Sequence, residues 1–161
     1  MNRKLLAPLL AIAAVPALAA PVSPAIGHET GNQKSEDRRA RAPAFMGLIN
    51  DAKSRIKEIH ASEMPQLLAQ NPKAKLIDTR EESEYAAGHI QGAEWIGKGV
   101  IERDIEAKHP DKSEPLYLYC GSGLRSALAA DNLQKMGYTN VWSIDGGWRV
   151  LKDLLPTRQV Q

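Results

Sequence analysis

The chain has 161 residues, of which 43% are apolar, 25% are charged and one is cysteine. This composition indicates one soluble globular domain with short additions. It excludes a collagen, a disulfide-rich scaffold and a wholly disordered chain, because glycine and cysteine are few and 21 Lys and Arg nearly balance 19 Asp and Glu.

The N-terminus has the pattern of a secretory signal peptide. Arg3 and Lys4 give a basic start, an apolar run covers residues 5–15, and residues 17–19 are the small-x-small sequence Ala-Leu-Ala. We therefore expect residues 1–19 to be a cleaved signal that directs the protein to the periplasm. A retained membrane anchor is the alternative, but the run is about half of the ~20 apolar residues that a span needs.

Removal of this segment takes away two cations and no acid, which leaves 19 basic and 19 acidic side chains. Non-specific binding to nucleic acid needs an excess of Lys and Arg. The sequence therefore predicts no nucleic-acid partner and no stable membrane anchor for the mature chain.

The rest of the chain divides by composition and periodicity. Residues 20–43 are polar and rich in Pro, Gly and Ser, which is typical of a flexible leader. Residues 44–157 are expected to form the folded domain, and residues 158–161 a short tail. In chain order the patterns predict helix 44–53, strand 56–59, helix 63–70 with Ser62 as its N-cap, strand 75–78, helix 81–87, strand 93–96, helix 100–108, strand 116–119, helix 126–136, strand 141–144 and helix 148–155.

This alternation of strands and helices indicates an α/β fold with a mainly parallel sheet covered on both faces. In such sheets, ligands bind beyond the carboxyl ends of the strands. The clearest strand, residues 116–119, leads directly into Cys120 at that edge.

Cys120 begins a glycine-spaced turn that continues into a helix. Gly121 and Gly123 are expected to take positive φ, so that successive amides point inward as an anion-binding nest at a helix N-terminus. This setting, with Arg125 nearby, favours a reactive thiolate. A cysteine at a strand end is otherwise most often a small buried apolar residue, but here strand, turn, arginine and helix start coincide.

Three segments together resemble the single-domain rhodanese-like sulfurtransferase family. They are the active-loop sequence Cys120-Gly-Ser-Gly-Leu-Arg-Ser126, a first signature made of Asp78-Thr-Arg-Glu81, Glu84 and Gly88-His-Ile-Gln-Gly-Ala93, and a last signature Gly146-Gly147-Trp148. Their order and spacing agree with the family from about residue 56 to residue 155. The resemblance implies a three-layer sandwich with a five-stranded, mainly parallel sheet and sulfur transfer through a persulfide on Cys120.

The resemblance also assigns roles to residues around the cysteine. It implies that a substrate-binding cradle is formed by the backbone of Gly121, Ser122, Gly123, Leu124 and Arg125. The Arg125 side chain is expected to hold the anionic part of a donor; an ion pair with a neighbouring acid is the alternative. Supporting residues are Asp78 and Arg80, which are expected to tie neighbouring loops together, Ser126, and Trp148, which is expected to line the pocket.

Loop length separates two chemistries that the resemblance allows. Residues 120–125 are six, the length used by the sulfurtransferase branch, whereas the related phosphatase branch has one residue more. Relatives that use 3-mercaptopyruvate as the donor carry Thr in place of Arg125. The identity of the donor therefore stays open, and the positive charge of Arg125 favours thiosulfate or a small persulfide.

The expected acceptor of the sulfur is cyanide, sulfite or a thiol. The alternative to an enzyme is a carrier that delivers the persulfide sulfur to a redox or sulfur-acceptor protein.

No cofactor is expected, and no metal site is expected either. The four histidines are scattered, and one cysteine cannot complete a zinc site. His89 lies within a Gly-His-Ile sequence and is expected to make a structural hydrogen bond.

Overall fold

The computed structural model describes residues 42–160; the expected signal peptide and residues 20–41 of the expected leader lie outside the described residues. In chain order the elements are α2 (Pro43–Lys53), β1 (Lys57–His60), the 3-10 helix η1 (Ala61–Glu63), α3 (Met64–Gln70), β2 (Lys75–Asp78), α4 (Glu82–Ala87), β3 (His89–Ile90), β4 (Glu94–Trp95), α5 (Ile101–Lys108), β5 (Leu116–Tyr119), α6 (Leu124–Lys135), β6 (Val141–Asp145), α7 (Gly147–Leu151) and β7 (Thr157–Arg158).

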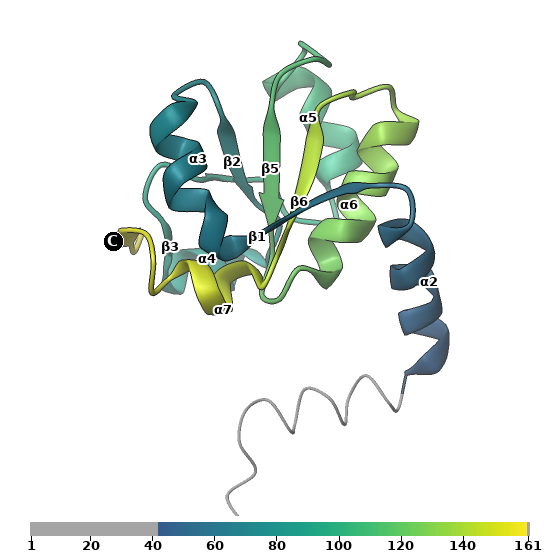
Figure 1. Ribbon diagram of the computed structural model, residues 1–161, viewed down its shortest axis with the longest axis horizontal. Helices are drawn as coiled ribbons and strands as arrows, with labels where there is room; N and C mark the ends of the chain where they lie inside the picture. The colour runs from purple at the N-terminus through teal and green to yellow at the C-terminus, as the bar shows by residue number, and fades with distance from the viewer. Residues whose placement is uncertain (1–41, 161) are drawn as a thin grey trace, which may run out of the picture.

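Five parallel strands form the central sheet in the order β1-β6-β5-β2-β4. Helices α2, α5 and α6 lie on one side of it and α3 and α7 on the other, while α4 lies near the carboxyl edge (Figure 1). The buried apolar residues form two clusters. Strand β5 contributes to both, with Leu116 and Leu118 in the first cluster and Tyr117 and Tyr119 in the second. This confirms the predicted α/β sandwich.

Two local predictions are wrong, and one pair of strands was not predicted. Ser62 does not cap a helix through its side chain; instead, the His60 ring accepts a hydrogen bond from the Ser62 N–H at the start of η1, and α3 begins only at Met64. The short strands β3 and β7 form a separate antiparallel pair that the patterns did not indicate. The last helix stops at Leu151 rather than at residue 155 and continues as a turn.

Helix α2, the first helix of the described residues, is held to the domain by buried apolar side chains and by ion pairs. Ile49 and Ala52 are fully buried on α2. Just after α2, Arg55 donates two hydrogen bonds of 3.0 Å to Asp131 of α6, which Lys135 also contacts at 2.7 Å. The hydrogen bonds from Arg55 lower the pKa of Asp131 from 3.8 to about 2. The charged form of this buried carboxylate therefore stabilises the fold.

We expect the Asp131→Asn variant to be less stable than the native protein by about 2 kcal/mol at neutral pH, since each pKa unit corresponds to about 1.4 kcal/mol. Because the folded pKa is depressed, this contribution is present above pH 3.8 and is lost as the pH falls toward about 2. Urea unfolding at pH 7 and pH 3 measures it. The exposed Asp153→Asn variant is the control, with an expected change below about 0.5 kcal/mol. Equal stability losses in the two variants would contradict this account.

Candidate active site

Cys120 directly follows the last residue of β5 and begins the turn into α6. Figure 1 shows this β5–α6 turn at the carboxyl edge of the sheet. Its Sγ accepts a hydrogen bond from the Gly123 N–H at 3.2 Å, and the Ser126 hydroxyl lies 3.8 Å from it. Ser126 is itself fixed by the Gly123 carbonyl and by Ser143. Cys120 is only 1% exposed. Its sulfur therefore faces a pocket formed by the turn rather than bulk solvent.

The two glycines of the turn differ in conformation. Gly123 caps α6 with φ +94°, and a Cβ there would lie 3.1 Å from the Ile144 carbonyl oxygen and from Asp145 Cα. Gly121 does not have a positive φ, so the expectation for that residue is wrong. The nest therefore depends on a single left-handed residue, together with the free amides at the start of α6.

A second glycine turn closes the loop from the other side. The Trp148 N–H at the start of α7 donates to the Cys120 carbonyl at 2.7 Å, and the Arg149 N–H donates to the Gly121 carbonyl at 3.2 Å. Gly147 has φ +50°, and a Cβ on it would overlap the Cys120 carbonyl oxygen. Helix α7 and the active loop thus approach at backbone contact.

The Arg125 side chain is engaged by two acids of the α4 region. It donates to both carboxylate oxygens of Glu84 at 2.9 and 3.1 Å and to Glu81 at 3.1 Å. Hydrogen bonding by Glu84 raises the pKa of Arg125. Burial alone would raise the pKa of Glu84, but the bonds from Arg125 outweigh it and lower that pKa. The ion pair that the sequence left as an alternative is therefore formed in this structure.

Asp78 and Arg80 form a buried ion pair at the end of β2. The Arg80 Nε lies 3.0 Å from both Asp78 oxygens, and its Nη2 donates to the Gly88 carbonyl at 2.6 Å. The guanidinium also lies 4.4 Å from the Trp148 ring centroid. Burial lowers the pKa of Arg80, but hydrogen bonds to Asp78 outweigh it and raise that pKa. The pair joins the end of β2 to α4 and α7, which is a scaffold role.

A cavity of about 400 Å³ opens over the cysteine. It is lined by Phe45, Glu84, Cys120, Gly121, Ser122, Leu124, Arg125, Trp148 and Arg149. The sequence did not indicate Phe45 or Arg149. It indicated Glu84 as part of the first signature but not as a residue of the cavity wall. Glu84 could have been inferred from its place in the first signature. No signal in the sequence pointed Phe45 toward Cys120, because that placement depends on how α2 packs.

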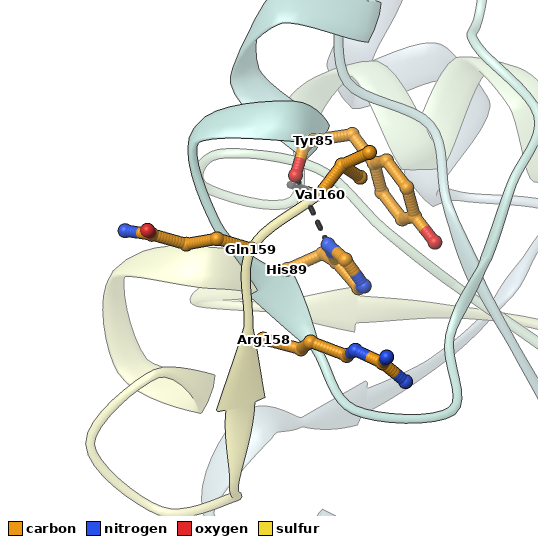
Figure 2. A pocket seen from close by; sticks show the side chains of 5 residues that line it. All are labelled: Tyr85, His89, Arg158, Gln159 and Val160. Carbon is orange, nitrogen blue, oxygen red and sulfur yellow. Dashed lines mark hydrogen bonds between the residues drawn. The ribbon is translucent and has the colours of Figure 1, made fainter.

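A second cavity, of about 720 Å³, lies by the β3–β7 pair and is lined by Tyr85, His89, Arg158, Gln159 and Val160 (Figure 2). There His89 stacks on Tyr85 with centroids 3.8 Å apart, and its Nδ1 donates to the Tyr85 carbonyl at 3.0 Å. His89 thus makes the expected structural hydrogen bond.

Residues 42–160 contain no group of three or more His, Cys, Asp or Glu that could hold a metal ion. Within the same residues, no helix is long and apolar enough to cross a membrane.

A comparison with family models decides the family. The model described as a rhodanese-like domain matches residues 60–153, from the end of β1 to the turn after α7. The chain belongs to the rhodanese-like domain family. The match contains both glycine turns, the cysteine loop and the Asp78–Arg80 pair. Helix α2 precedes it.

Among known proteins, this rhodanese-like chain is similar to the uncharacterized protein YqhL of Bacillus subtilis, with 40% identity over 77 residues. It is 31% identical over 96 residues to the putative sulfur carrier protein YrkF of the same organism. These matches cover 48% and 60% of the chain, but only 60% and 51% of YqhL and YrkF. The chain is also 32% identical over 108 residues to the thiosulfate sulfurtransferase GlpE of Pseudomonas entomophila, covering 67% of the chain and 95% of that protein.

The fold has solved counterparts. The solution NMR structure of the rhodanese-like domain from the Anabaena protein Alr3790 aligns with a TM-score of 0.58 and 25% sequence identity. The alignment covers 63% of this chain and 78% of the Anabaena domain. This likeness supports the α/β fold described above.

Proposed function

We propose that this rhodanese-like protein is a sulfurtransferase that moves a sulfane sulfur through a persulfide on Cys120. The observation that carries the proposal is the position of the Cys120 Sγ. It accepts a hydrogen bond from the Gly123 N–H at 3.2 Å and faces a cavity lined by the turn. Such a nest of amides stabilises a sulfur anion in both the thiolate and the persulfide form.

With thiosulfate as donor, the reaction has two displacement steps. In the first, the thiolate attacks the outer sulfur, the S–S bond of thiosulfate breaks, and sulfite leaves with the bonding electron pair. In the second, an acceptor such as cyanide attacks the outer sulfur of the persulfide, giving thiocyanate and the original thiolate. A single covalent intermediate shared by both steps predicts ping-pong kinetics.

Mass spectrometry of the intact protein tests the proposal. Incubation with thiosulfate is expected to add the mass of one sulfur atom to Cys120, and subsequent addition of cyanide is expected to remove that mass and release thiocyanate stoichiometrically. Peptide mapping locates the adduct on the only cysteine of the chain. The protein is reduced first and the reductant is removed before thiosulfate is added, because reductants also cleave a persulfide. The absence of any adduct on this reduced protein would contradict sulfur transfer through Cys120.

A carrier role is the second candidate, favoured by the similarity to a protein named as a putative sulfur carrier. A carrier would form the same persulfide but transfer it slowly to small acceptors and rapidly to a partner protein. Single-turnover decay of the persulfide with cyanide therefore distinguishes the two roles. Rapid decay supports the enzyme, and a long-lived persulfide supports the carrier.

The expected signal peptide leads us to propose that the protein acts in the periplasm. The intact mass of the mature protein from whole cells tests export, because cleavage after Ala19 removes a defined N-terminal segment. In that oxidising compartment, the lone thiol needs a small thiol or a redox partner to restore it after oxidation.

The Arg125–Glu84 pair predicts a change in donor affinity. In the Glu84→Gln variant the cavity loses one negative charge and Arg125 keeps only Glu81 as a charged partner, so KM for the thiosulfate dianion is expected to fall about two- to fivefold, the range expected from partly exposed ion pairs. Steady-state kinetics at constant ionic strength measures it. Glu82→Gln on the same helix is the control, because Glu82 does not line the cavity. An increase in KM would show that Glu84 itself assists donor binding.

A further inference from the structure

Helix α2 lies outside the family-matched residues, yet it contributes to the cavity over Cys120. Its Phe45 side chain is 39% exposed and lines that cavity. The helix is held in place, since Lys53 at its end contacts Glu58 at 2.8 Å and Asp145 at 3.2 Å. Phe45 is therefore an apolar wall at a fixed position, on a helix that precedes the family-matched residues.

The positive charges of the cavity are not equivalent. Arg125 already donates three hydrogen bonds to Glu81 and Glu84. Arg149, by contrast, has no acidic partner among residues 42–160, while its backbone N–H is fixed to the Gly121 carbonyl of the active loop. The cation available to an incoming anion is thus Arg149.

The size of the cavity also bears on the donor. Its volume of about 400 Å³ lies within the range of about 300–1,000 Å³ that is typical of sites for organic ligands. A five-atom inorganic anion such as thiosulfate fills only part of it. An apolar wall, an arginine without an acidic partner among the described residues 42–160, and this volume together fit an organic molecule with a single negative charge.

We propose that Phe45 and Arg149 form a donor subsite for a monoanionic organic sulfane-sulfur compound. The anionic group binds Arg149, and the hydrocarbon body packs against Phe45 and Leu124. With a thiosulfonate donor, the Cys120 thiolate attacks the terminal sulfur, the S–S bond breaks, and the organic sulfinate leaves with the electron pair; charge balances at each side of the step. The inference rests on the proposed function and specifies its substrate class.

The first test compares two donors that share one reacting group. Benzenethiosulfonate and methanethiosulfonate are both monoanions and differ in the apolar body. The ratio of kcat/KM for the benzene over the methane compound is expected to fall about tenfold in Phe45→Ala, as truncation of an apolar contact surface implies. Leu48→Ala on the same helix is the control: Leu48 is 62% exposed and does not line the cavity, so the ratio stays at the native value. An unchanged ratio in Phe45→Ala overturns the assignment of Phe45.

The second test concerns charge. In Arg149→Gln, KM for both thiosulfonates is expected to rise about tenfold, the loss expected for a hydrogen bond to a charged group. Lys152→Gln is the control, because Lys152 lies just beyond α7 and pairs with Asp153. Equal KM changes in the two variants would point to a general field effect and contradict a specific role for Arg149.

Binding of benzenesulfonate, which carries no transferable sulfur, separates this inference from the proposed function. Calorimetry with the native protein is expected to show binding that weakens about tenfold in Phe45→Ala and in Arg149→Gln. If binding follows this pattern but no donor forms a persulfide, the proposed function fails and the subsite stands. If persulfide forms from thiosulfate but benzenesulfonate does not bind, the subsite is wrong and the proposed function stands.

Discussion

Replacement of Cys120 by serine is expected to lower kcat/KM for sulfur transfer from thiosulfate to cyanide by about four orders of magnitude, since loss of a covalent nucleophile removes the chemical step itself. The serine hydroxyl is not ionised at neutral pH and forms no persulfide. Colorimetric measurement of thiocyanate, together with the intact mass after incubation with thiosulfate, tests the expectation.

The fold of this variant is expected to be unaffected, because serine is smaller than cysteine and the Gly123 N–H can donate to its oxygen in place of the sulfur. Thermal unfolding monitored by circular dichroism is the control. Substantial turnover by Cys120→Ser with an unchanged fold would show that another group accepts the sulfur, and the proposed function would have to be abandoned.

The Gly147→Ala variant is expected to lose both stability and activity. Gly147 has φ +50°, and an added Cβ would overlap the Cys120 carbonyl oxygen and lie 3.0 Å from the Ser122 nitrogen. Because these atoms are backbone, α7 or the active loop must move. We expect a loss of at least about 3 kcal/mol in stability, a fall in Tm of about 10 °C or more, and a decrease in kcat of about a hundredfold from displacement of the reacting sulfur.

Gly92→Ala is the matched control for Gly147→Ala. Gly92 also has a positive φ, +85°, but a Cβ there would meet no atom within 4 Å. This variant therefore reports the strain of the left-handed backbone alone, about 1 kcal/mol, with activity retained. If the two variants behave alike, the packing of α7 on the active loop is not the cause of the loss.

Much of the site follows from residues that are neighbours in the sequence. Strand β5, Cys120 and the glycine-spaced turn at the start of α6 are consecutive, and their propensities and hydrogen bonds are local. The left-handed Gly123 was predicted from this spacing. Gly121 was not predicted correctly, because two glycines in one turn do not reveal which of them takes the positive φ; packing against Ile144 and Asp145 determines that.

The alternation of strands and helices by itself determined the fold class, and one cysteine at a strand end before Gly-x-Gly predicted the nucleophile that we propose. Only the tertiary structure decided three other features: Arg125 binds Glu81 and Glu84 rather than facing the cavity freely, α7 closes the active loop at Gly147, and α2 brings Phe45 to the pocket. Each depends on segments far apart in the chain, whose approach is set by the packing of buried faces rather than by local propensity.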